Sequence, residues 1–227
     1  MGTDDIHKKK RSTRKIRVEH KAVLIALEDT KSSRYYFEAL IKDKKLTGAI
    51  VFAHHIGTDP KNVLEAIVRH EREHPKEKYE KRWIVIDKDD WSKEQINGTI
   101  ERARELDICV AISNEAYELW ILLHFRSVAR HMNRRELISE LNKIFKVRFG
   151  IEYDKSSHDI YGLIVGLQTV ALKNAKALIR RHLEVNDYIS PYDCNPITMI
   201  FELVECLNGL YKDRNDCNCF PEISIKC

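Results

Sequence analysis

Short runs of apolar residues alternate with amphipathic segments along the first half of the chain. The apolar runs, each of a length that suits one strand, lie at 21–28, 48–55, 82–87 and 108–113. The segments with the apolar spacing of helices lie at 32–44, 59–74, 92–107 and 115–125. Strands that are apolar on both faces are typical of a parallel sheet covered by helices on both sides. The alternation therefore predicts an α/β domain over 21–125, with a parallel sheet flanked by helices.

Beyond residue 125 the apolar residues follow helical spacing only. Three such segments lie at 133–149, 159–183 and 195–212. We therefore expect residues 126–227 to form a C-terminal helical extension packed on the sheet. Residues 1–20 are predicted to form a basic N-terminal arm, in which 7–17 contains no acid. Such an arm either contacts phosphate groups or remains solvated.

The composition limits the class of protein. With 227 residues, of which 43% are hydrophobic, the chain can bury a sizeable core. No apolar run approaches the ~20 residues that a membrane helix needs, and no secretory segment follows the basic N-terminus. The six cysteines are scattered, so we expect no disulfide framework. These observations predict a cytoplasmic protein without a membrane segment.

Two of the predicted strands end in carboxylates. Glu28 follows the first strand, and Asp87 and Asp89 end the third. Because parallel strands point the same way, these side chains converge at one edge of the sheet if the two strands are neighbours. Converging carboxylates repel one another unless a cation lies between them, and hard oxygen ligands suit Mg²⁺ or Mn²⁺. We therefore favour a metal site, against the alternative that such acids cap helices and start turns, as Asp29 and Asp90 would.

A further acid and several basic residues are candidates for the same site. Glu118 lies on the first turn of the helix predicted after the fourth strand; it could bind a second ion, or it is simply favoured there by the helix dipole. Lys88, between the two aspartates, either binds phosphate or faces solvent. One face of the helix that begins near residue 172 presents the basic residues Lys173, Lys176 and Arg180. This face suits a nucleic-acid backbone, although a solvated helix face would look the same.

The strand that ends in Glu28 and the later "DKD" turn resemble the TOPRIM domain of topoisomerases, primases and OLD-type nucleases. More specifically, the chain resembles the RloB-like family of prokaryotic defence proteins over about residues 20–211. The segments that carry this resemblance are "LIALEDTKSSRYYFEAL", "RWIVIDKDDW", "AISNEAYELWILLHF" and "NPITMIFELVECL". The sequence departs from the family where Asp29 and Ser33 replace a glycine and a second glutamate, and where Glu115 replaces a proline. A supporting carboxylate is then expected at Asp29 or Glu115.

The resemblance implies a TOPRIM-like, Rossmann-type fold and a Mg²⁺-dependent nuclease acting in defence. Glu28 would act as general base or acid, or as a metal ligand, while Asp87 and Asp89 hold Mg²⁺ or Mn²⁺ and Glu118 assists. The substrate stays open between DNA and RNA, including tRNA. The rival interpretation is a catalytically weak module that binds or senses nucleic acid for a partner ATPase. A homo-oligomer is also left open, and no membrane partner is expected.

Overall fold

The structure is a computed structural model, and it describes residues 23–211. Over these residues the chain forms a five-stranded sheet in the order β2-β1-β3-β4-β5. The strands are β1 (Val23–Leu27), β2 (Ile50–Phe52), β3 (Lys81–Asp87), β4 (Cys109–Asn114) and β5 (Ile197–Thr198). The first four strands are parallel, and β5 is antiparallel to β4. The predicted α/β class is confirmed, whereas the arm expected at 1–20 lies outside the described residues.

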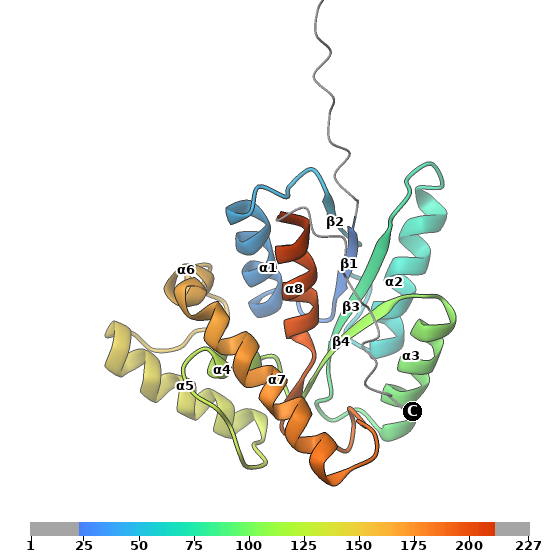
Figure 1. Ribbon diagram of the computed structural model, residues 1–227. Coiled ribbons are helices and arrows are strands. Elements are labelled where there is room, and N and C mark those ends of the chain that lie inside the picture. The colour runs from blue at the N-terminus through green and yellow to red at the C-terminus, as the bar shows by residue number, and fades with distance from the viewer. Residues whose placement is uncertain (1–22, 212–227) are drawn as a thin grey trace, which may run out of the picture.

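Helices cover both faces of this sheet (Figure 1). On one face lie α2 (Pro60–Glu73) and α3 (Lys93–Glu105), and on the other lie α1 (Ser32–Asp43) and α8 (Ile200–Tyr211). A second group of helices lies on the side of α1 and α8. It consists of α4 (Glu118–Leu123), α5 (Arg134–Phe149), α6 (Ile160–Ile164), a 3-10 turn (Val165–Leu167) and α7 (Gln168–Val185).

Capping residues fix where several helices begin. The Asp59 side chain caps α2 by accepting a hydrogen bond from a backbone N–H in the first turn. Ser92 and Gln95 form a capping box at the start of α3, and Asn133 and Glu136 form another at the start of α5. The starts of these helices therefore follow from local sequence.

The pairing of β1 with β3 lies at the centre of the sheet. Leu27 of β1 is in register with Val85 of β3, and the Glu28 N–H donates to the Val85 carbonyl oxygen at 3.0 Å. β3 also pairs with β4, where Asp87 is in register with Ser113. The prediction that the first and third strands are neighbours is confirmed. The last residues of both strands consequently reach the same edge of the sheet.

Beyond residue 125, where the sequence showed helical spacing only, β5 extends the sheet past β4. Thr198 of β5 is in register with Ser113 of β4, and their hydroxyl oxygens are 2.8 Å apart and fully buried. A strand of two residues is too short to produce a recognisable apolar period. The last strand of the sheet thus comes from the part of the chain predicted to be a helical extension. The domain boundary at residue 125 stays a prediction.

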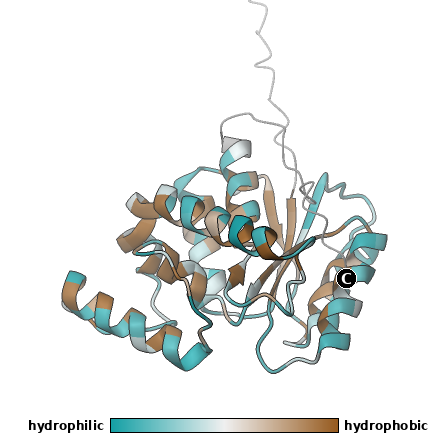
Figure 2. Ribbon diagram, turned by 60° about the horizontal axis from the view of Figure 1, so that its bottom comes forward, coloured by the Kyte–Doolittle hydropathy of each residue, from teal (hydrophilic) through white to brown (hydrophobic). Residues whose placement is uncertain are grey.

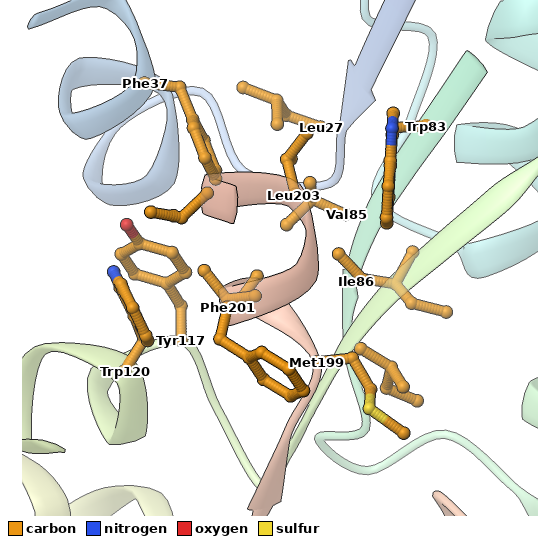
Figure 3. Close-up of a cluster of buried hydrophobic side chains, with 14 of the residues drawn as sticks. Leu27, Phe37, Trp83, Val85, Ile86, Tyr117, Trp120, Met199, Phe201 and Leu203 are labelled. Atoms are coloured by element: carbon orange, nitrogen blue, oxygen red, sulfur yellow. The ribbon is translucent and has the colours of Figure 1, made fainter. Parts of the chain in front are cut away.

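The segment from β5 into α8 supplies much of the core on its face of the sheet. Met199, Phe201 and Leu203 are buried and lie between α1, α4 and the strands. The neighbouring side chains drawn in Figure 3 are Leu27, Phe37, Trp83, Val85, Ile86, Tyr117 and Trp120. The central strands are hydrophobic along most of their length, as expected for strands covered on both faces (Figure 2). The C-terminal helix is therefore part of the same core as the sheet.

The structure bears on two expectations drawn from composition. No apolar run of membrane-spanning length was expected, but by length and composition alone the helical stretch Ile160–Val185 could cross a membrane. Within it, α7 buries Ala171, Ala175 and Leu178 on one side.

No disulfide framework was expected from the scattered cysteines. Among the described residues, Cys109 in β4 and Cys206 in α8 are each disulfide-bonded.

Replacing Thr198 with valine should destabilise the protein more than replacing Ser113 with alanine. Thr198 Oγ1 contacts Ser113 Oγ and also accepts a hydrogen bond from the Ile200 N–H at 3.3 Å, so valine leaves two buried polar groups without this partner. We expect the free energy of unfolding to fall by roughly 2–4 kcal/mol for Thr198→Val and by about 1–2 kcal/mol for Ser113→Ala. Urea denaturation measures both values, and equal losses would contradict this account of β5.

Candidate functional site

The carboxylate of Glu28 lies against the end of β3. Its Oε2 accepts a hydrogen bond from the Asp87 N–H at 2.6 Å. This contact follows from the sheet, because the residue after β1 and the last residue of β3 reach the same edge. The two acids expected to converge therefore do so, while their roles in catalysis and metal binding remain predictions.

Asp89 is turned toward the same position by its backbone. Its φ of 39° lies in the left-handed region, which aspartate adopts more readily than most residues. The Asp89 N–H donates to the Glu115 carbonyl oxygen at 3.1 Å, so the turn after β3 is anchored to the segment after β4. Asp87 and Asp89 consequently present their carboxylates to one side chain, Arg134 of α5.

Arg134 bridges the two aspartates. Its Nη2 lies 2.7 Å from Asp87 Oδ2, and its Nη1 lies 2.8 Å from Asp89 Oδ2. The sequence analysis did not link this residue to the acids. Arg134 lies at the start of α5, 45 residues after Asp89, and no spacing pattern in the sequence connects the two. Only its neighbouring helix cap, Asn133 with Glu136, could have been recognised from sequence.

Glu118 begins α4 and is only 4% exposed. It lines the same cleft as the other three acids. The hydroxyl groups of Tyr117 and Tyr153 are buried nearby and have no hydrogen-bond partner among the described residues. Burial raises the pKa of Tyr153, and the negative charges of Glu118, Asp29 and Asp87 raise it further. Both hydroxyl groups are therefore uncharged donors behind the acidic edge.

The four acids carry more negative charge than the site neutralises. Burial, with a smaller contribution from the charge of Asp89, raises the pKa of Glu28 to about 7. Hydrogen bonds to its carboxylate act in the opposite direction. Burial and the charges of Glu28 and Glu118 raise the pKa of Asp87 well above its usual value, which Arg134 offsets only in part. Burial also raises the pKa values of Asp89 and Glu118. Protons or a further cation would thus be favoured at this edge.

An open cleft with a volume of about 590 Å³ contains this site. Its basic lining residues are His55, Arg134, Lys31 and Lys155. The remaining lining residues are Glu28, Asp29, Thr30, Ser32, Thr58, Asp87, Asp89, Asp90, Trp91 and Glu118. Acidic and basic side chains that line one cleft together suit a phosphate group that approaches a metal ion. Sequence reasoning missed Lys31 and Lys155, which lie on loops without a spacing signal.

The donor chemistry fits a hard divalent cation, but the arrangement does not yet form a metal centre. Among residues 23–211, no group of three or more His, Cys, Asp or Glu side chains is arranged to hold a metal ion. One oxygen each of Asp87 and Asp89 is instead paired with Arg134. Carboxylate oxygens are nevertheless the donors that Mg²⁺ or Mn²⁺ prefers.

Lys88 does not line the cleft. Its Nζ lies 3.7 Å from Glu115 Oε1 and 5.3 Å from the centre of the Tyr192 ring, on the other side of the turn. On α7, Lys176 forms an ion pair with Glu205 at 2.6 Å. The structure does not bring the three predicted basic residues of α7 into the cleft; these are Lys173, Lys176 and Arg180. Contacts between these residues and nucleic acid therefore remain predictions for a different surface.

The acids proposed as replacements for the missing family glutamate have other partners. Asp29 caps the start of α1, where it accepts hydrogen bonds from Ser32 Oγ at 2.5 Å and from the Ser33 N–H at 3.1 Å. Glu115 accepts a hydrogen bond from the Arg134 N–H at 3.1 Å and does not line the cleft. His55 Nε2 lies 2.9 Å from the Glu28 carbonyl oxygen, so it supports the turn after β1.

Replacing Glu28 with glutamine should raise the melting temperature at pH 8 and leave it nearly unchanged at pH 5, with EDTA present. The pKa of Glu28 rises from 4.5 to about 7 on folding, so the wild type loses stability as the pH rises through this range. Glutamine keeps an acceptor for the Asp87 N–H and carries no charge. We expect a gain of about 1–3 kcal/mol at pH 8 after allowing for solvent screening.

The exposed pair of Glu73 with Arg69 provides the control for this experiment. Glu73→Gln removes the same charge outside the cleft and should give no gain that grows with pH. An equal gain for Glu28→Gln at pH 5 and pH 8 would contradict the raised pKa.

Residues 23–207 match the family model described as RloB-like protein. No curated protein and no solved structure matches the chain. The matched range runs from β1 into α8 and includes Glu28, Asp87, Asp89 and Glu118 of the cleft. Since the match covers well over half of the sequence, the chain belongs to the RloB-like protein family.

Proposed function

We propose that this RloB-like protein is a divalent-metal-dependent nuclease of the TOPRIM type, which hydrolyses phosphodiester bonds in nucleic acid. The observation that carries the proposal is the meeting of Glu28, Asp87 and Asp89 at the carboxyl edge of the sheet, in an open cleft. The carboxyl edge is where parallel sheets bind their ligands. Lys31 and Lys155 beside the acids support a substrate that carries phosphate.

The resemblance to defence proteins supplies the wider context of this proposal. The substrate would be DNA or RNA, with tRNA as one candidate, and the reaction would serve prokaryotic defence in the cytoplasm. A companion ATPase and a second copy of this chain are the protein partners that we propose to test. A soluble protein is consistent with α7, which packs one side of the helix into the core.

In this proposal the residues of the cleft divide the chemistry between them. A bound Mg²⁺ or Mn²⁺ would neutralise the phosphodiester and lower the pKa of an attacking water. Asp87 and Asp89 would hold this ion, and Glu118 would support it from behind. Because the Asp87 N–H already binds Glu28 Oε2, we assign the proton taken from water to Glu28 Oε1. A carboxylate whose pKa lies near 7 can accept and release this proton at neutral pH.

A second candidate function is a catalytically weak module that binds or senses nucleic acid for a partner ATPase. The pairing of Arg134 with Asp87 and Asp89 favours this candidate, because the arginine neutralises acids that a metal ion would otherwise pair with. The use of Asp29 as a helix cap also favours it, since Asp29 is then not free to replace the missing family glutamate. Cleavage by the purified wild type separates the two candidates.

Glu28→Gln should abolish nucleic-acid cleavage while leaving the fold intact. Glutamine has nearly the same shape and can still accept the Asp87 N–H, but it cannot take a proton from water. We expect a fall of at least about 100-fold in the cleavage rate, as is typical when a general base is lost. The assay uses a panel of single-stranded and duplex DNA, RNA and tRNA with Mg²⁺ or Mn²⁺, with and without a companion ATPase.

Glu73→Gln serves as the matched control in the cleavage assay and should cleave at the wild-type rate. Undiminished cleavage by Glu28→Gln would overturn the assigned role of Glu28. No cleavage by the wild type on any substrate would favour the binding module instead.

Mg²⁺ or Mn²⁺ should raise the melting temperature of the wild type but not that of Asp87→Asn. An ion that binds only the folded state stabilises it by RT ln(1 + [L]/Kd), where [L] is the ion concentration and Kd its dissociation constant. Asparagine removes the charge that would hold the ion. Equal shifts for both proteins in a thermal melt would show that the stabilising ions bind elsewhere.

A further inference from the structure

Arg134 holds one oxygen of each of the two aspartates that a metal ion would bind. Its guanidinium bridges Asp87 Oδ2 and Asp89 Oδ2, at 2.7 and 2.8 Å. A divalent cation bound by the same two carboxylates would lie beside the guanidinium, where the two positive charges repel each other and compete for the same negative charge. Arg134 therefore opposes metal binding at these two acids as long as it holds them.

The backbone of Arg134 is fixed, whereas its side chain is held by few contacts. Its N–H donates to Glu115 Oε2, and the capping box of Asn133 and Glu136 closes the start of α5 around it. The side chain is 40% exposed, and its Nε has no hydrogen-bond partner among the described residues. The guanidinium can therefore leave the aspartates without unwinding the first turn of α5.

The cleft offers a released guanidinium a second partner. Arg134 lines it together with Lys31 and Lys155, so three basic side chains line the cleft that a phosphate would enter. A planar guanidinium binds two phosphate oxygens at once, which an ammonium group cannot do. Loss of the aspartates as partners would thus be offset by contact with the substrate.

We propose that Arg134 is a built-in competitor for the metal site. In the metal-free protein it holds Asp87 and Asp89, and it is displaced when a divalent cation binds. The freed guanidinium then binds a phosphate of the nucleic acid in the same cleft. This inference rests on the proposed function, and it makes the occupancy of the metal site depend on metal and substrate together.

The first test measures Mn²⁺ binding to the metal-free full chain by isothermal titration calorimetry. Arg134→Gln should bind Mn²⁺ about tenfold more tightly than the wild type, as expected when two partly exposed ion pairs no longer compete. Arg126→Gln is the matched control. Arg126 pairs with Glu140 of α5, the helix that carries Arg134, and is 44% exposed, but it does not line the cleft. It should bind Mn²⁺ like the wild type.

Arg134→Lys is a second variant that tests the same inference if Arg134→Gln does not fold. Lysine keeps the charge but cannot span both carboxylates, so its Mn²⁺ affinity should lie between those of the wild type and Arg134→Gln. Circular dichroism melts establish that each variant is folded. Equal or weaker Mn²⁺ binding by both folded variants would overturn the inference, as would the absence of Mn²⁺ binding in every protein.

The second test concerns the phosphate contact. In a Glu28→Gln background with Mn²⁺, Arg134→Gln should weaken binding of a short single-stranded oligonucleotide several-fold relative to Arg126→Gln, measured by fluorescence anisotropy. Unchanged affinity would overturn the second role of Arg134. Tighter Mn²⁺ binding by Arg134→Gln without any cleavage by the wild type would preserve the competition and overturn the nuclease. Cleavage by the wild type, together with Mn²⁺ binding by Arg134→Gln that equals that of the wild type, would preserve the nuclease and overturn the competition.

Discussion

Because β1 and β3 pair in parallel, the residue after one strand and the last residue of the other must share an edge of the sheet. This pairing buries Glu28 against Asp87 and creates a repulsion that the rest of the site has to offset. The Asp87 N–H offsets part of it by donating to Glu28, and Arg134 offsets another part. The hydrophobic pairing of the strands thus fixes in place a charge arrangement that is unfavourable by itself, which is common at functional sites.

The C-terminal half of the chain completes this edge rather than simply covering it. Asn114 at the end of β4 donates to the backbone carbonyls of Pro191 and Tyr192, and Asn195 donates to Asn114 Oδ1 at 3.0 Å. Asn195 Oδ1 in turn accepts from the Met132 N–H, just before α5. Asn114 and Asn195 therefore link the sheet to the segments that carry β5 and Arg134.

Most of the fold could be predicted from sequence because its signals are local. The apolar runs and the caps at Asp59 and Ser92 identify β1 to β4 and the helices between them. β5 could not be predicted, since two residues carry no period and their pairing with β4 depends on contacts 85 residues apart along the chain. In the site, strand ends identified Glu28, Asp87 and Asp89. The partners supplied by α5 and the loops, Arg134 above all, depend on packing between distant segments and leave no local pattern.

With Arg134 on Asp87 and Asp89, one guanidinium faces four acids whose pKa values are raised, so the site still favours added positive charge. If Arg134 competes with a metal ion as proposed, the site would have two states that differ in the bound cation rather than in the fold. A divalent ion would supply more charge to the two aspartates, and the released guanidinium would then need a new anionic partner. A phosphate in the cleft would provide that partner. Metal and substrate would in this way stabilise each other's binding through a single side chain.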